Sequence, residues 1–171
     1  MQVDLDGVIF RDLLNLSDDR GVLTEVFREE WNSIKPVQWN VVSSQANVVR
    51  GLHAHTVHTD VLTVISGSLV LGLVDLRPQS ATRGNTAVVR MQPLKTSVLI
   101  PVGVGHLFCF DEVTTFAYGV TDYWDPEDEL GCRWDDPELD FSLPVSDPLL
   151  SVRDRNAGTL QELKSSIAAQ L

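Results

Sequence analysis

The middle of the chain, from about residue 36 to residue 123, is a series of short apolar or alternating runs. The runs are rich in Val, Thr, Leu and Phe, and Gly, Pro, Ser and Asn separate them. "VLTVISGSLVLGLVDLR" predicts two strands joined at Ser66-Gly67-Ser68, and "TAVVRMQ", "TSVLIP", "HLFCF" and "TTFAYGVTDY" predict further strands. Strands at this spacing, without helical patterns between them, favour an antiparallel sandwich, barrel or jelly roll.

Two stretches outside this region predict helices. The first is "LTEVFREEWNSI", residues 23–34. The second is "TLQELKSSIAAQL" at the C-terminus, where Leu160, Leu163, Ile167 and Leu171 recur at helical spacing. We expect the C-terminal helix to pack against the strands rather than to act in function. The length of 171 residues predicts a single domain over residues 1–171, large enough to bury a core.

The charge balance limits the possible partners. The chain has 24 Asp and Glu against 13 Lys and Arg, a net charge of −11, which argues against a nucleic-acid partner. Cys109 and Cys132 are too few for a disulfide framework, and we expect them to be buried small hydrophobes in a reducing compartment. The start "MQVDLDGVIFRD" lacks a signal-peptide profile, and no apolar run approaches a membrane span. We therefore expect a cytoplasmic protein with no membrane partner.

The stretch "RGLHAHTVHTDVLTVISG" holds three of the four histidines. On a strand, His53 and His55 would share a face, because residues two apart point to the same side. Asp60 follows, and "PVGVGH" places His106 at the start of another strand. The pattern H-x-H-x4-D-x6-G, then P-x-G-x2-H, resembles the two motifs of the cupin superfamily, with aspartate where glutamate is usual. The resemblance implies an all-β, cupin-like antiparallel jelly-roll barrel, here with a short C-terminal helix.

The residues of the two cupin motifs surround a metal in that superfamily. Their counterparts here are candidate ligands, and three imidazoles with one carboxylate suit Fe, Mn, Ni, Zn or Cu. The alternative is that Asp60 pairs with a nearby histidine and no metal binds. We expect His58, between the motif positions, to be a solvated loop residue. The candidate metal set is His53, His55, Asp60 and His106.

A second resemblance covers residues 19 to about 160. The matching stretches are "DDRGVLTEVFRE", "VQWNVVSSQANVVRGLH", "SGSLVLGLVDLRPQSATRG", "IPVGVGHLF", "AYGVTDYWDPEDELGCRWDDPEL" and "SVRD". Their order and spacing resemble the dTDP-4-dehydrorhamnose 3,5-epimerase family, a cupin-fold group without a required metal. The resemblance implies a nucleotide-linked 4-keto-6-deoxyhexose as substrate.

The same resemblance implies the catalytic residues. The ketone of such a sugar acidifies the C–H bonds on both neighbouring carbons, so a base can remove one proton and an acid can return it from the opposite face. His53 falls on the base of the family, and a histidine can work near neutral pH. Asp154 falls on the aspartate that orients that imidazole, and Tyr118 falls on the proposed acid.

Further positions match those that hold the substrate in the family. Arg50 would meet the diphosphate, because a planar guanidinium makes bidentate contacts. Some of the nucleotide-binding positions reach across from the partner subunit of a dimer, so the resemblance also implies a homodimer. The remaining substrate-binding candidates are Arg20, Glu25, Gln38, Asn40 and His106.

Three departures from the family concern the reaction centre. Asp60 stands where the family has a lysine that stabilises the enolate oxygen, Leu71 replaces the aspartate that partners this lysine, and His55 replaces a usual glutamine. Exchanging lysine for aspartate turns an attraction into a repulsion, and each term is about 4 kcal/mol at ~4 Å with an effective dielectric of ~20. A divalent ion at Asp60 would restore positive charge, but it would also occupy His53 if that residue were a ligand.

The sequence therefore predicts an epimerase that inverts C3, C5 or both in a dTDP-linked keto sugar and needs no cofactor. One alternative is a metal-dependent cupin enzyme, an isomerase or oxidase acting on a sugar-like substrate. The other is a catalytically silent homologue that binds a sugar nucleotide.

Overall fold

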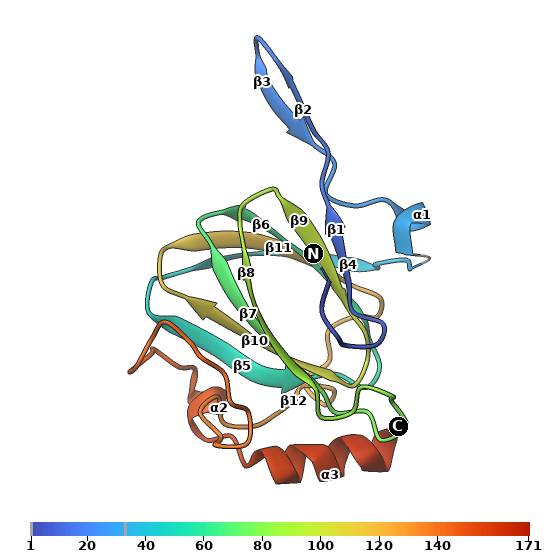
Figure 1. Cartoon of the computed structure of the whole chain (residues 1–171), viewed down its shortest axis with the longest axis vertical. Helices are drawn as coiled ribbons and strands as arrows, with labels where there is room; N and C mark the ends of the chain where they lie inside the picture. The colour runs from blue at the N-terminus through green and yellow to red at the C-terminus, as the bar shows by residue number, and fades with distance from the viewer. Residues whose placement is uncertain (1, 33) are drawn as a thin grey trace.

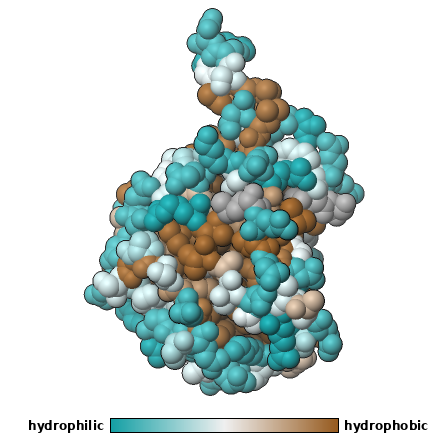
Figure 2. Space-filling model, viewed as in Figure 1, coloured by the Kyte–Doolittle hydropathy of each residue, from teal (hydrophilic) through white to brown (hydrophobic). Residues whose placement is uncertain are grey.

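Two five-stranded antiparallel sheets face each other in the computed structural model, which describes residues 2–32 and 34–171 (Figure 1). Their strand orders are β1-β9-β6-β11-β4 and β12-β5-β10-β7-β8, which confirms the predicted all-β jelly-roll architecture. Apolar atoms gather between the sheets in the space-filling view of the same face, and hydrophilic atoms surround them (Figure 2). The strands of the two sheets are β1 (Ile9–Asp12), β4 (Gln38–Ser44), β5 (Val48–Ala54), β6 (Asp60–Ser66), β7 (Leu69–Asp75), β8 (Thr86–Met91), β9 (Thr96–Ile100), β10 (Val104–Phe110), β11 (Thr114–Val120) and β12 (Leu130–Gly131).

The turn between β6 and β7 lies at the predicted junction Ser66-Gly67-Ser68, and it connects one sheet to the other. Gly67 has φ 74°, which only glycine adopts without strain. A Cβ at this position would also collide with the carbonyl oxygen of Val113 and the side chain of Thr114. The glycine therefore lets the chain turn a tight corner from one sheet to the other.

Strand β7 is buried along its whole length, because both of its faces are covered. Leu71 and Leu73 point into the core between the sheets, whereas Val70 and Val74 belong to a second apolar cluster on the outer face. A strand buried on both faces reads as a continuous apolar run. The second cluster also holds Cys109 and Cys132, which are buried free thiols as expected.

The C-terminal helix α3 (Leu160–Gln170) covers this second cluster and confirms the helix predicted there. Leu160, Leu163 and Ile167 are buried, but Leu171 lies beyond the helix and is exposed. Thr159 and Glu162 form a capping box that satisfies backbone donors at the helix start. No helix within residues 2–32 and 34–171 is long and apolar enough to cross a membrane.

The helix predicted over residues 23–34 is wrong for most of its length. A hairpin of β2 (Asn15–Asp18) and β3 (Gly21–Thr24) occupies the start of this region, and helix α1 (Glu29–Asn32) is a single turn. Leu23 pairs with Leu16 and Thr24 with Asn15, so strand pairing holds the start of the predicted stretch in an extended conformation. Ser33 of the predicted stretch and Met1 lie outside the described residues.

The β2–β3 hairpin forms an arm that projects away from the two sheets (Figure 1). Its apolar side chains Leu14, Leu16, Val22 and Leu23 are between 52% and 63% exposed. In Figure 2, apolar atoms surround the base of the arm, while its tip is hydrophilic.

Candidate active site

A cavity of about 610 Å³ reaches residues of both sheets and of the C-terminal segment. Its apolar wall includes Val42, Phe108 and Phe116, and its polar residues are concentrated on β5, on the segment that follows β5 and on helix α2 (Val152–Arg155). The described lining contains six of the predicted functional residues from distant parts of the chain. These six are Arg50, His53, His55, Asp60, His106 and Tyr118, and Asp154 of α2 is a seventh.

Strand β5 positions His53, and helix α2 positions Asp154 beside it. His53 Nε2 lies 2.6 Å from Asp154 Oδ1. Gly51 holds a φ of 101°, and a Cβ there would lie 2.7 Å from the carbonyl oxygen of His106 on the neighbouring strand. This close approach explains the glycine in "RGLH". Ser151 caps α2 by accepting from the backbone N–H of Asp154 at 3.0 Å, which fixes the carboxylate toward the imidazole.

The His53–Asp154 pair suits support of an imidazolium ion. Burial by itself raises the pKa of the Asp154 carboxyl, but the hydrogen bond and charge of His53, together with the Ser151 hydroxyl, outweigh it and lower that pKa. Asp154 is therefore ionised at neutral pH. When Nε2 of His53 donates to this carboxylate, Nδ1 carries the lone pair that can accept a proton.

Tyr118 on β11 faces the same cavity from the opposite sheet. Burial, and then the negative charge of Asp60, raises the pKa of the Tyr118 hydroxyl, so it is protonated at neutral pH. Arg50 on β5 also lines the cavity, where its Nε donates to Ser44 Oγ at 3.4 Å. The candidate base His53 with its partner Asp154, and the candidate acid Tyr118, thus lie on different walls of one cavity.

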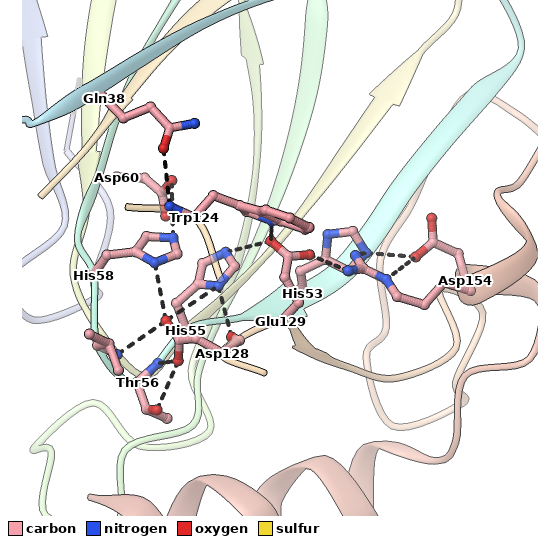
Figure 3. A network of polar contacts seen from close by, with 12 residues as sticks. Gln38, His53, His55, Thr56, His58, Asp60, Trp124, Asp128, Glu129 and Asp154 are labelled. Atoms are coloured by element: carbon pink, nitrogen blue, oxygen red, sulfur yellow. Dashed lines mark hydrogen bonds and ion pairs between the residues drawn. The ribbon is translucent and has the colours of Figure 1, made fainter. Parts of the chain in front are cut away.

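Three lining residues that the sequence analysis did not single out surround His53. The Arg153 guanidinium contacts His53 Nε2 and forms an ion pair with Glu129. Glu129 Oε1 accepts from Trp124 Nε1 at 2.9 Å. Figure 3 shows the Glu129 carboxylate between the rings of His55 and His53. Arg153 lies within "SVRD", directly beside the predicted Asp154, and this adjacency was the available signal.

A second polar cluster lies on the other side of Glu129 (Figure 3). His58, expected in solvent, is only 2% exposed, so that prediction is wrong. Its Nδ1 lies 3.1 Å from Asp128 Oδ2, and its ring stacks on His55 with the centroids 3.9 Å apart. Asp128 also accepts from the backbone N–H and the hydroxyl of Thr56, at 2.7 and 2.9 Å. These bonds hold the loop that carries His58 against the protein, so that His58 is buried.

Burial dominates the protonation of this cluster. It lowers the pKa of His55 to about 4, with the nearby His58 acting in the same direction. It also holds the pKa of His106 well below its ordinary value. For Asp60, burial and the charges of Glu129 and Asp128 raise the pKa well above its ordinary value.

The structure brings three of the four candidate metal ligands together. His55, Asp60 and His106 each offer one donor atom, and these atoms lie within 4.8 Å of one another. His53 is not in this group, and its ring centroid is 6.4 Å from that of His106. His55, His58 and Asp128 form a second group, whose donor atoms also lie within 4.8 Å of one another.

Four predicted substrate-binding residues do not line the cavity of this chain. Arg20 is on the projecting arm and pairs with Asp18, and Glu25 pairs with Arg28 at 2.7 Å. On β4, Gln38 Nε2 donates to Asn40 Oδ1 at 3.1 Å. The four predicted residues outside the lining are Arg20, Glu25, Gln38 and Asn40.

Comparisons with known proteins agree with this geometry. A family model described as dTDP-4-dehydrorhamnose 3,5-epimerase matches residues 2–162. A dTDP-4-dehydrorhamnose 3,5-epimerase of Methanothermobacter thermautotrophicus is 31% identical over 174 residues, covering 95% of this chain and 94% of the relative. The enzyme of the same name from Pseudomonas aeruginosa is 34% identical over 161 residues, covering 88% of each chain.

Solved structures extend the similarity to three dimensions. NovW, a 4-keto-6-deoxy sugar epimerase from Streptomyces spheroides, superposes with a TM-score of 0.88 at 30% identity, covering 96% of this chain and 88% of its own. The Legionella pneumophila epimerase in complex with dTDP-4-keto-L-rhamnose superposes with a TM-score of 0.89 at 29% identity, covering 98% and 95%. Since the family model and both kinds of relative span nearly the whole chain, this protein belongs to the dTDP-4-dehydrorhamnose 3,5-epimerase family.

Proposed function

We propose that this protein epimerises a dTDP-linked 4-keto-6-deoxyhexose at C3, C5 or both, by removing a proton next to the ketone. The observation that carries the proposal is the His53–Asp154 pair, which faces the same cavity as Tyr118 on the opposite sheet. His53 takes the proton, and Asp154 stabilises the imidazolium that forms. Tyr118 returns a proton from the other face of the sugar, which inverts the carbon. The reaction moves only protons, so it needs no redox cofactor.

The polar residues around this pair would bind the substrate. Arg50 meets the diphosphate through its guanidinium, and His106 contacts the sugar. Arg20 lies on the arm and Glu25 directly follows it, and neither lines the cavity of its own chain. In the proposed homodimer, the arm of one subunit brings these two residues to the nucleotide of the other. Exposed apolar side chains on the arm give it a surface to bury against a second copy.

Solvent deuterium incorporation tests the proposed reaction. In deuterated water, the wild-type protein should incorporate deuterium beside the ketone of dTDP-4-keto-6-deoxyglucose. His53→Asn should abolish this exchange, and Tyr118→Phe should impair it, because each removes one proton carrier. Tyr123→Phe is the matched control, since Tyr123 is 75% exposed and lies outside the cavity lining. Exchange at wild-type rate in His53→Asn would refute the assignment of the base.

The presence of Asp60 supports a second candidate function, in which the protein binds a sugar nucleotide without catalysing a reaction. A carboxyl group stands where the family places the lysine that stabilises the enolate. If it were ionised, it would repel the developing negative charge. This candidate predicts that dTDP binds, and that wild-type protein incorporates no deuterium under any metal condition.

A further inference from the structure

Three buried side chains at one end of the cavity have no acid or base role in the proposed reaction. His55 directly follows β5, Asp60 begins β6, and His106 lies on β10. They are 5%, 6% and 4% exposed, and one donor atom from each lies within 4.8 Å of the others. The stretch from His55 to Asp60 and the distant strand β10 therefore bring two imidazoles and a carboxylate close together.

Polar atoms in this group lack partners within the chain. Among residues 2–32 and 34–171, no side-chain hydrogen bond reaches the Asp60 carboxylate, and its nearest cationic candidate is His58 Nε2 at 3.9 Å. His106 Nδ1 is buried and likewise has no hydrogen-bond partner within that range. Buried polar groups are normally hydrogen-bonded, and buried charges are paired or coordinate metals. Atoms of Asp60 and His106 are therefore available to a ligand from outside the chain.

The neighbouring group of His55, His58 and Asp128 differs, because its atoms satisfy one another. His58 Nδ1 lies 3.1 Å from Asp128 Oδ2, and Asp128 accepts from the Thr56 backbone and hydroxyl. His55 Nδ1 lies 3.1 Å from the Asp128 carbonyl oxygen, to which it donates. This bond leaves the lone pair on Nε2 of His55 and fixes the ring, as carbonyl groups do behind metal-binding histidines.

We propose that His55, Asp60 and His106 bind one divalent transition-metal ion, and that His53 is not a ligand of it. Two imidazoles and one carboxylate are a recurring three-residue set that leaves coordination positions open for water or substrate. His53 is held instead by Asp154, 2.6 Å from its Nε2. The base and the metal thus use different histidines, which removes the conflict that arises when His53 serves as both.

The position of the ion would account for the change from lysine to aspartate, a point that rests on the proposed function. Asp60 occupies the lysine position of the family, and it lies in the same cavity as His53 and Tyr118. A cation held there restores positive charge beside the substrate ketone and can polarise it as a Lewis acid. Nearby Asp128 and Glu129 add negative charge that favours a cation.

Zinc binding to the full-length protein tests the site without any sugar present. Protein stripped with a chelator should bind one Zn²⁺ per chain in titration calorimetry, and Co²⁺ should give the visible absorption of a nitrogen-ligated site. Asp60→Asn and His106→Gln should each abolish tight binding. The matched controls are His53→Asn and His58→Gln, which should both retain one ion per chain. Circular dichroism monitors folding of each variant.

Two results would overturn the metal site: wild-type protein that binds no zinc, or His53→Asn that loses binding as completely as Asp60→Asn. If the ligand variants do not fold, anomalous scattering from zinc-soaked wild-type crystals decides. The peak must lie at about 2.0–2.2 Å from one atom of each of the three residues. A peak elsewhere rejects the site.

The deuterium assay separates failure of this site from failure of the epimerase function. Exchange that disappears on chelation and returns with Zn²⁺ supports both proposals. Zinc bound by the three residues without any exchange supports the site and refutes the reaction. Exchange at full rate in wild-type protein that binds no zinc supports the reaction and refutes the site.

Discussion

Asp154 is placed in the first turn of α2 by the Ser151 cap, and its carboxylate reaches His53 at 2.6 Å. Replacing it with asparagine keeps the shape of the side chain but removes the charge that supports the imidazolium. We predict that Asp154→Asn lowers kcat by about 10²- to 10⁴-fold. The affinity for dTDP should stay unchanged, because the nucleotide does not contact this carboxylate in the proposed complex. Deuterium exchange rates and dTDP titrations measure the two quantities, and an equal loss in both would contradict the assigned role.

Tyr118 gives a test of the electrostatics inside the cavity. Burial and then the charge of Asp60 raise the pKa of its hydroxyl. We predict that Asp60→Asn, in metal-free protein, lowers the pKa of Tyr118, since a neutral amide no longer opposes tyrosinate formation. Ultraviolet difference titration follows this change. Tyr123 is the internal reference because it is 75% exposed, and an unchanged Tyr118 titration would show that Asp60 does not act on it.

At the residue scale, family motifs led to residues that share one cavity, whereas the chemistry of a single residue misplaced one of its neighbours. "RGLH", "SVRD" and the tyrosine of "FAYGVTDY" led to His53, Asp154 and Tyr118, which the fold brings to one cavity. The residue context alone placed His58 in solvent, because a histidine in a polar loop gives no local sign of burial. Its burial depends on Asp128, which lies 70 positions further along the chain. Such long-range pairing is not encoded in the short stretch around either residue.

At the scale of elements, the end of β7 is held by a polar turn. Asp75 accepts from the guanidinium of Arg77 at 2.7 Å, from Ser80 Oγ at 2.5 Å and from Thr82 Oγ1 at 2.7 Å. Burial raises the pKa of Asp75, but these hydrogen bonds outweigh it and lower the pKa to about 2. Because the folded-state pKa is below the ordinary 3.8, this turn stabilises the fold fully above that pH.

We predict that Asp75→Asn lowers the free energy of unfolding by roughly 2–3 kcal/mol at neutral pH. The difference from wild type should shrink as the pH falls from the ordinary pKa of 3.8 toward about 2, where the native carboxyl is itself protonated. Urea unfolding across this pH range measures it. Asp135→Asn is the control, since its ion pair with Arg133 is exposed. A pH-independent difference would mean that the charge of Asp75 contributes nothing.

The two predicted helices differ in outcome because only one buries an apolar face completely; the described side chains of residues 23–31 and 34 are partly or fully exposed. Leu160, Leu163 and Ile167 bury their side chains against the outer face of a sheet, so helical spacing and tertiary contact agree. Residues 23–34 have helix-forming Glu and Arg residues, but strand pairing with β2 holds the start of this region in the arm. Helices this short depend on packing rather than on propensity.

At the scale of the whole molecule, the strands between residues 36 and 123 were predictable because turn residues separate them clearly. Strands β1, β2 and β3 lie before that region and were not predicted. The arm in particular gains little from its own chain, since Leu16 and Val22 are 52% and 63% exposed. We expect the contacts that hold the arm in place to come from the second copy in the proposed homodimer.

The exposed apolar side chains of the arm and of β4 predict the oligomeric state. Val22 on the arm and Val41 on β4 are 63% and 73% exposed. Burying such surface against a second copy would be favourable by about 25 cal/mol per Å² of apolar area. We predict that wild-type protein is a dimer by sedimentation equilibrium, and that the double variant Val22→Asp, Val41→Asp is a folded monomer. Val113→Asp, at a residue 59% exposed outside both segments, should remain dimeric.

Loss of the dimer should also weaken the binding of dTDP, because Arg20 and Glu25 would no longer reach the cavity of the partner subunit. Each lies on or next to the arm, and neither lines the cavity of its own chain. In the monomeric double variant, we expect dTDP affinity to fall about as far as it falls in Arg20→Ala, with no further loss when the two changes are combined. Such non-additivity arises when two changes remove the same contact. A monomer that binds dTDP as tightly as wild type would show that one chain forms a complete nucleotide site.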